Sequence, residues 1–397
     1  MKRKNLIIVG NGGGGGFRDE TGLYTHFAHG MLVNLLAEYY EKVTWCAPKE
    51  ETKSDNLALR LADNVVLVAH PRARSTLNSF KYLGEYKKAW KEALAEPGDV
   101  FLRGMFPAVG AFYKTCQQGD FRPLHWLVGN PIALIKSHRR NGFIMDNLAL
   151  LYAKRWENTI KRGVERTDGA FLCFGEELFD RVDGYTRYNI IGAPVLEEDI
   201  YFREDTCQND TIRILFVGFV RPEKGVQYLI EALSLLRTQR KVELVCIGTR
   251  SDKFAAYNKL LDETIKKNGL EDRVSFPGYL GREEIYENMR NADLFVLPTL
   301  SEGAGFVLIE SLSQGLPVIA SAVGGLPTTI DDGKDGLLVP PKAPAAIADA
   351  IDCVIEDEEL RRGLIANGYD KVRETTYDKF ASKIVGILDQ MNGRDSD

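Results

Sequence analysis

The sequence predicts an α/β protein built from two doubly wound domains. Three observations support this fold class. The chain has 397 residues, more than one hydrophobic core usually supports, so two domains are expected. Short apolar runs typical of buried parallel strands alternate with helical patterns along the chain. Two of these runs, beginning at Asn5 and Ile212, each lead through a glycine-containing loop into a helical pattern.

Composition excludes several classes of protein. Hydrophobic and charged residues make up 44% and 27% of the chain, as in an ordinary soluble globular protein. No apolar run is long enough to span a bilayer, and the first residues lack the pattern of a signal peptide. The six cysteines form no Cys-x-x-Cys pair, so we expect a reducing, cytoplasmic environment with neither disulfides nor a zinc site.

The first half of the chain is predicted to form one domain. A buried-strand pattern at residues 5–9 precedes a glycine-rich segment, residues 10–16, and a helical pattern from about residue 22 to 40. This order of strand, glycine loop and helix predicts a phosphate cradle. Further strands are expected at 43–46, 65–69, 100–103, 124–128, 170–174 and 188–192, with helices near 76–95, 107–117 and 145–166.

A nicotinamide cofactor is disfavoured for this domain. The glycine-rich segment contains a literal Gly-x-Gly-x-x-Gly, but six of its seven residues are glycine, so the match has little weight. Ala47 and Pro48 follow the second strand, where a dinucleotide site would carry an acid for the ribose.

The most informative stretch of the second half is residues 292–338. A buried strand at 294–298 ends in a glycine turn that carries Glu302, and a helix with Glu310 follows. Ligands of open α/β sheets bind outside the carboxyl ends of the strands. A helix that starts there also presents free N–H groups and a positive dipole end to anions. Without the surrounding motif, the two carboxylates would be interpreted as solvated helix charges.

This stretch resembles family 4 of the retaining glycosyltransferases. Glu302-x7-Glu310 is followed by Gly315-Leu-Pro-Val, Gly324-Gly-Leu-Pro and Asp332-Gly-x-x-Gly-Leu-Leu-Val-Pro-Pro, in the order and spacing of that family. The resemblance implies the GT-B fold, in which two Rossmann-like domains face each other across a cleft. We predict the domains at residues 1–195 and 211–376, a linker at 196–210, and a last helix at 377–397 that crosses back to the first domain.

The resemblance implies a reaction as well. The expected activity is transfer of a sugar, with retained configuration, from a UDP- or GDP-sugar to a glycan or glycolipid acceptor in cell-surface polysaccharide synthesis. The family usually works without a metal, and none is expected here. The Asp-x-Asp at residues 395–397 ends a polar tail and is a poor metal-site candidate.

Several residues receive roles by the same resemblance. Glu302 would hold hydroxyls of the transferring sugar, Glu310 would hold the ribose hydroxyls, and Lys224 would hold the diphosphate. Lys224 occupies the lysine of the family pattern Gly-Arg-x-x-x-x-Lys-Gly, whereas Phe219 stands at its arginine. Only Arg221 is near enough to take over from that arginine. Further donor-binding candidates are Gly303, Ala304, Gly305 and Phe306; Gly248, Thr249 and Arg250; Tyr279 and Leu280; and Gly13, Gly14, Gly15 and Gly16.

The family's acceptor-side histidine is absent from this chain. Gly129 and Asn130 follow the strand at 124–128, and Asn130 is the candidate for hydrogen bonding the sugar in place of that histidine. His125 lies within the strand and is expected to be a satisfied core residue.

Two interpretations besides a transferase remain open. One is a non-catalytic nucleotide-sugar binding protein, which the substitutions at Phe219 and Gly129 favour; the other is a nucleotide-sugar epimerase on the same fold. Intact Glu302, Glu310 and Lys224 argue for the enzyme.

The charge distribution suggests partners. Residues 1–195 carry 27 Lys and Arg against 21 Asp and Glu, although the formal charge of the whole chain is −5. Overall acidity disfavours nucleic acid, whereas a basic first half is compatible with an anionic acceptor or membrane. Lys136, His138, Arg139 and Arg140 form a cationic cluster among apolar residues. This cluster predicts either peripheral contact with an anionic membrane or an ordinary surface loop.

Overall fold

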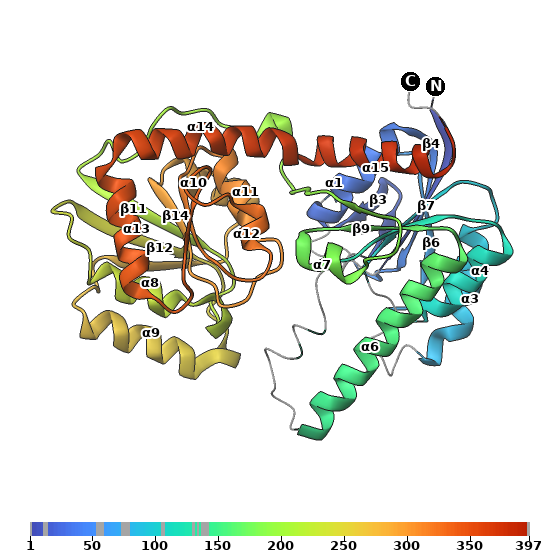
Figure 1. Cartoon of the computed structure of the whole chain (residues 1–397), viewed down its shortest axis with the longest axis horizontal. Coiled ribbons are helices and arrows are strands. Elements are labelled where there is room, and N and C mark those ends of the chain that lie inside the picture. Colours follow the sequence, from blue (N-terminus) through green and yellow to red (C-terminus); the bar gives the residue numbers. More distant parts are fainter. Residues whose placement is uncertain are drawn as a thin grey trace. The chain divides into compact units, whose positions relative to one another are not determined.

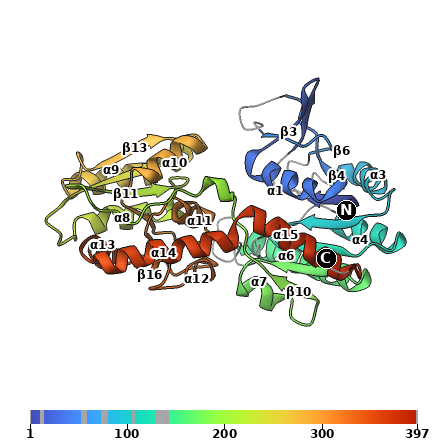
Figure 2. The same ribbon diagram turned by 90° about the horizontal axis from the view of Figure 1, so that it is seen from above.

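The computed structural model describes residues 2–10, 15–52, 59–72, 80–104, 108–128, 132, 135 and 143–394. The chain divides into two compact units. Unit 1 comprises Met1–Ile191 together with Tyr377–Asp397, and unit 2 comprises Gly192–Thr376. Figures 1 and 2 show both units from two sides, coloured along the sequence.

Unit 1 is built on a seven-stranded parallel sheet in the order β10-β9-β8-β7-β1-β4-β6. β1 (Arg3–Gly10) pairs with β4 (Tyr40–Pro48) on one edge and with β7 (Asp99–Arg103) on the other. The strand order therefore reverses beside β1, which makes this the topological switch point of the sheet. The remaining strands are β6 (Val65–His70), β8 (Pro123–Trp126), β9 (Ala170–Cys173) and β10 (Arg187–Asn189).

Helices pack on this sheet through apolar side chains. Trp90, Phe112 and Ile160 of three helices share one buried cluster with Ile7 of β1. These helices are α3 (Leu83–Ala93), α4 (Val109–Gln118) and α6 (Phe143–Arg166). α1 (Phe27–Glu38) instead packs with the chain's last helix, α15 (Tyr377–Met391), and Figure 1 shows the two side by side. A short helix, α7 (Glu176–Arg181), precedes β10, and a 3-10 turn, η1 (Phe80–Tyr82), precedes α3.

Residues 17–25 differ from the prediction. Where the sequence predicts a helix from about residue 22, the structure has a hairpin of β2 (Phe17–Asp19) and β3 (Gly22–Thr25), extended by β5 (Leu59–Arg60). Leu23 and Thr25 are buried while Tyr24 between them is half-buried, which is the period of two that a strand shows. The predicted strand–glycine loop–helix cradle is therefore interrupted by this hairpin.

Unit 2 repeats the doubly wound plan with a six-stranded parallel sheet in the order β13-β12-β11-β14-β15-β16. β11 (Thr211–Val217) pairs with β12 (Lys241–Ile247) and with β14 (Leu294–Leu297), so its switch point lies between β11 and β14. The other strands are β13 (Val274–Gly278), β15 (Val318–Ser321) and β16 (Leu337–Val339).

The helices of unit 2 cover both faces of its sheet. α8 packs with α9 and α13, and α11 packs with α14. The helices are α8 (Val226–Leu233), α9 (Ala255–Lys267), α10 (Arg282–Arg290), α11 (Phe306–Ser313), α12 (Leu326–Thr329), α13 (Pro344–Glu356) and α14 (Glu358–Thr375). Three 3-10 turns are η2 (Glu197–Asp199), η3 (Pro222–Lys224) and η4 (Asp252–Phe254).

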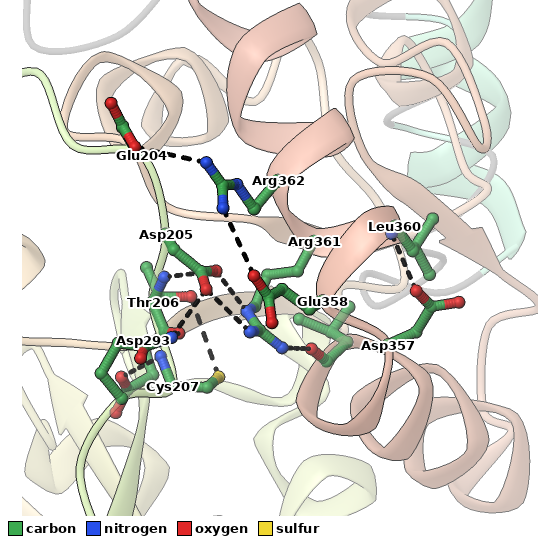
Figure 3. A network of polar contacts seen from close by, with 12 residues as sticks. Glu204, Asp205, Thr206, Cys207, Asp293, Asp357, Glu358, Leu360, Arg361 and Arg362 are labelled. Carbon is green, nitrogen blue, oxygen red and sulfur yellow. Dashed lines mark hydrogen bonds and ion pairs between the residues drawn. The ribbon is translucent and has the colours of Figure 1, made fainter.

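Residues 196–210, predicted as a linker, are fastened into unit 2. Arg361 of α14 is 4% exposed and donates hydrogen bonds to the carboxylate of Asp205 at 2.6 and 3.0 Å. The backbone N–H of Cys207 donates to Asp293 at 2.7 Å, and Figure 3 shows these contacts in one network. The acidic, weakly periodic sequence of this segment gives no sign of such partners, because they come from residues far along the chain.

No helix within the described part of the chain is both long and apolar enough to cross a bilayer.

Candidate functional site

The switch point of unit 2 brings two predicted site residues together. Lys224 ends η3, which follows β11, and Glu302 lies in the turn after β14. Lys224 Nζ donates a hydrogen bond to Glu302 Oε2 at 2.5 Å, although 78 residues separate them. The two side chains are only 15% and 19% exposed, so the ion pair is poorly screened by water.

The backbone around Lys224 is locked onto the segment after β14. The carbonyl of Glu223 accepts hydrogen bonds from Leu300 N at 2.7 Å and Thr299 Oγ1 at 3.0 Å. Gly225 has φ 67°, and a Cβ atom there would lie 2.0 Å from Pro298 O. Glycine is therefore needed beside Lys224, both for the left-handed backbone and for this close approach.

Glu302 is held by a second close approach. A Cβ atom at Gly324 would lie 2.0 Å from Glu302 O, so the Gly324-Gly-Leu-Pro motif passes directly under the Glu302 turn. The other carboxylate oxygen, Glu302 Oε1, accepts a hydrogen bond from Gly303 N at 3.2 Å. Both oxygens of this carboxylate thus have donors within the protein.

Glu310 has the opposite character. It is half-buried on α11, and its carboxylate forms no hydrogen bond with any residue that the structure describes. Burial raises the pKa of Glu310 to about 7; the positive charge of Arg282 opposes this rise and Asp199 adds to it. Arg282 itself is paired with Asp199 at 2.6 Å and donates to Tyr286 Oη at 2.8 Å. Glu310 is thus a hydrogen-bond acceptor without a donor in the described part of the chain.

The loop after β11 places Arg221 differently from Lys224. Arg221 Nε lies 3.0 Å from Glu223 Oε1, and its guanidinium lies over the ring of Phe219, 5.2 Å from the centroid. Phe219, at the position of the family arginine, is 63% exposed. Arg221 is thus a neighbour of the Lys224 turn but has no contact with Glu302 in the structure.

The remaining donor-binding candidates of unit 2 follow the carboxyl ends of adjacent strands. Gly248, Thr249 and Arg250 follow β12, Tyr279 and Leu280 follow β13, and Gly303, Ala304, Gly305 and Phe306 follow β14. Tyr279 is 73% exposed. Arg250 is already engaged by Asp262 at 2.8 Å and by the face of Phe276 at 4.6 Å.

The unit 1 candidates are less complete. Gly13, Gly14, Asn130, the cluster of residues 136–140 and residues 395–397 lie outside the described residues. Gly15 and Gly16 are buried, and Gly16 N donates to Pro48 O at 2.8 Å, which ties this segment to the end of β4.

Two further features of the chain bear on the site predictions. The prediction for His125 is confirmed: it is fully buried and hydrogen-bonded to Tyr113 Oη at 2.6 Å and to Gly104 O at 2.9 Å. Arg103, which the sequence predictions do not include, ends β7 at the switch point of unit 1, at the carboxyl end of a predicted strand. Over the described ranges, no group of three or more His, Cys, Asp or Glu residues could hold a metal ion.

Residues 197–371 match the family Glycosyl transferases group 1. This segment contains both members of the Lys224–Glu302 pair and also Glu310. An uncharacterized glycosyltransferase of Methanocaldococcus jannaschii is 31% identical over 193 residues, 48% of each chain. D-inositol 3-phosphate glycosyltransferase of Jonesia denitrificans is 34% identical over 181 residues, 45% of this chain and 42% of that protein. The chain thus matches less than half the length of these relatives.

Solved structures match over nearly the whole chain. Sucrose-phosphate synthase from Thermosynechococcus elongatus has a TM-score of 0.70 at 20% identity, over 99% of this chain and all of that one. HepE of Anabaena, in complex with UDP and glucose, has a TM-score of 0.62 at 16% identity, over 98% of this chain and 100% of that one. Units 1 and 2 are two Rossmann-like domains of the GT-B fold, and the predicted fold class is confirmed.

Proposed function

We propose that the protein is a retaining glycosyltransferase that moves a hexosyl group from a UDP- or GDP-sugar to a glycan or glycolipid acceptor, in cell-surface polysaccharide synthesis. The observation that carries this proposal is the Lys224–Glu302 ion pair at the switch point of unit 2, inside the segment that matches the group 1 family. HepE, a neighbour in fold, binds UDP and glucose, which supports a nucleotide sugar as the donor.

The proposed chemistry follows from charge. A departing nucleoside diphosphate accumulates negative charge while the sugar becomes cationic. Lys224 and the N–H groups at the start of α11 would stabilise the leaving group as that charge develops. This arrangement needs no metal ion, and we propose that transfer is metal-independent. The ion pair with Glu302 fixes Lys224 in place before the donor binds, so the side chain loses less conformational entropy during the reaction.

Glu310 would bind the ribose of the donor. Ribose hydroxyls are hydrogen-bond donors, and the Glu310 carboxylate is an acceptor that no described residue donates to. A half-buried carboxylate that lacks hydrogen bonds gains more free energy from two hydroxyl partners than a carboxylate that already has protein donors.

Hydrolysis of the donor without acceptor tests the transferase against the alternatives of a nucleotide-sugar binding protein and an epimerase. We expect slow release of UDP or GDP from the matching sugar nucleotide, lost in Glu302→Gln and kept in Glu263→Gln, an exposed carboxylate on α9. The nucleotide is first chosen by thermal shift with UDP, GDP and ADP, because binding raises stability by RT ln(1 + [L]/Kd). Stabilisation without hydrolysis would indicate a binding protein, and epimerised sugar nucleotide would indicate an epimerase.

We also propose that unit 1 contacts an anionic membrane at its cytoplasmic face, where lipid-linked acceptors are presented. Met145, Leu148 and Leu151 of α6 are 58%, 54% and 65% exposed. Lys154 and Arg155 on the same helix are exposed and have no carboxylate partner among the described residues. An apolar helical face with unpaired cations is the surface that peripheral proteins present to anionic lipid.

A further inference from the structure

Arg103 is a cation at the switch point of unit 1 with no carboxylate partner among the residues that the structure describes. It ends β7, opposite Gly10 of β1, where the order of the strands reverses. Its guanidinium lies over the ring of Trp126, 4.8 Å from the centroid. Its Nε atom is buried and lacks a hydrogen-bond partner, and the side chain forms no ion pair with any described residue.

Arg221 also has a buried Nε atom without a hydrogen bond, but Glu223 lies 3.0 Å from it as a counter-charge. Two other arginines of the fold are fully compensated. Arg361 is paired with Asp205 at 2.6 Å and also donates to two carbonyls. Arg203 donates to the carbonyls of Met289, Arg290, Ala292 and Gly315. A charge withdrawn from water costs free energy unless it is compensated in this way. Arg103 is half-buried with a buried Nε atom and has neither kind of compensation among the described residues, so a bound anion would supply what it lacks.

His29 supplies a second unused nitrogen beside Arg103. The two residues line one small cavity of about 30 Å³ together with Gly10, Trp45 and apolar side chains. The Nε2 atom of His29 is buried and has no partner. Burial, followed by the positive charge of Arg103, lowers the pKa of His29 to about 3, so at neutral pH the ring is uncharged and can donate one N–H.

We propose that Arg103 and His29 bind an oxyanion group, a phosphate or a carboxylate, of the acceptor. The guanidinium fork matches two oxygens of such a group, and the imidazole adds a third donor. The cavity of about 30 Å³ is small, so only oxygens of the anionic group enter it and the rest of the acceptor stays outside. That the bound group belongs to an acceptor rests on the proposed function, whereas the oxyanion site does not depend on it.

Indole N–H resonances provide a direct test on the full-length chain. The protein has four tryptophans, all in unit 1. Trp45 lines the cavity and Trp126 lies under Arg103, whereas Trp90 packs in the core against Tyr86 and Trp156 against Tyr152. Inorganic phosphate, added against chloride at equal ionic strength, should shift the resonances of Trp45 and Trp126 saturably and leave those of Trp90 and Trp156 in place. Acetate, added in the same way, reports on a carboxylate.

Substitutions at Arg103 complete the test. Arg103→Met should weaken phosphate binding about tenfold or more, and Arg103→Lys should bind with intermediate affinity because it keeps the charge without the fork. Arg162→Met removes an exposed cation from α6 and should bind like the native protein. Because Arg103→Met removes an uncompensated charge, its melting temperature should equal or exceed that of the native protein.

Three results would overturn the oxyanion site: no shift with either anion, a shift that survives in Arg103→Met, or a strong drop in the melting temperature of both Arg103 variants. The last would give Arg103 a structural role. None of these results touches the transferase proposal, which the hydrolysis assay decides separately. Conversely, resonance shifts without any hydrolysis of a sugar nucleotide would support the oxyanion site but would not identify its ligand as a glycosyl acceptor.

Discussion

The two switch points of the protein differ in how their cations are compensated. In unit 2, Lys224 is paired with Glu302 at 2.5 Å before any ligand is present. In unit 1, Arg103 has no carboxylate partner among the described residues. A ligand of unit 2 would therefore contact a cation whose charge Glu302 already balances. Lys224 would then orient the ligand more than it would raise its affinity. A ligand of unit 1 would supply an anionic partner that Arg103 lacks among the described residues, which favours affinity.

Glu310 adds to this comparison, because its carboxylate has the opposite sign when ionised and forms no hydrogen bond with any described residue. Under the two proposals above, the ligands of the two units would meet groups of opposite charge. Glu310 would accept hydrogen bonds from hydroxyls in unit 2, and Arg103 would donate them to an oxyanion in unit 1.

Breaking the Lys224–Glu302 ion pair should produce the largest loss of activity. Lys224→Ala removes the cation that faces the departing diphosphate and leaves Glu302 without its partner. We expect kcat/KM for sugar transfer to fall about 10²–10³-fold, the usual loss when one donor to a developing negative charge is removed. Arg221→Ala should cost less, because Arg221 contacts Glu223 and Phe219 rather than Glu302.

Initial rates of sugar transfer are measured for Lys224→Ala and Arg221→Ala in parallel, with the donor at saturating and at limiting concentrations. Equal or reversed losses would show that Arg221, and not Lys224, serves the diphosphate. An unchanged rate in both variants would argue for a binding protein.

The pKa of Glu310 predicts a pH dependence of stability. Because burial raises it from 4.5 to about 7, folding favours the protonated form. The stabilisation is complete below about pH 4.5 and is lost as the pH rises through about 7, a change of at most about 3 kcal/mol. Urea unfolding at about pH 5 and about pH 8 should show this loss in the native protein and a smaller loss in Glu310→Gln. An identical pH dependence in the two proteins would mean that Glu310 titrates normally.

The same carboxylate should contribute to nucleotide affinity. Glu310→Ala removes the proposed ribose acceptor, and we expect UDP or GDP binding to weaken by about 1–3 kcal/mol, the range for a hydrogen bond to a charged group. Isothermal titration calorimetry at about pH 8, where Glu310 is mostly ionised, measures this directly. Glu263→Gln serves as the control, and an unchanged Kd in Glu310→Ala would remove Glu310 from the donor site.

Sequence reasoning reached further in unit 2 than in unit 1, and the reason is physical. Lys224 and Glu302 lie in turns, and Glu310 lies on the helix that starts after one of them. The glycines of these turns follow recognisable strands, so the placement of all three residues could be predicted. The 2.5 Å contact between Lys224 and Glu302 could not be predicted, because it joins residues 78 positions apart. Likewise the hairpin at 17–25 depends on pairing with Leu59 and Arg60, and the fixing of 196–210 depends on Arg361. Whether Arg103 is compensated is equally a property of the packed molecule.

The smallest expected effect concerns the uncompensated cations of α6. If Lys154 and Arg155 face anionic lipid, Lys154→Ala with Arg155→Ala should weaken binding to vesicles of phosphatidylglycerol and phosphatidylcholine by about 1 kcal/mol per cation at low salt. Adding salt should reduce the difference, because the Debye length falls to about 8 Å at physiological ionic strength. Co-sedimentation with the vesicles measures both quantities.

The matched control is Lys87→Ala with Lys88→Ala, which removes two exposed cations from α3 of the same unit. Equal partitioning of the two double variants would show that only the net charge matters and that α6 does not face the lipid. Leu148→Ser with Leu151→Ser tests the apolar part of the same face, since those side chains are 54% and 65% exposed. This variant should lose vesicle binding even where salt has already suppressed the contribution of the cations, because apolar burial in the bilayer is not screened.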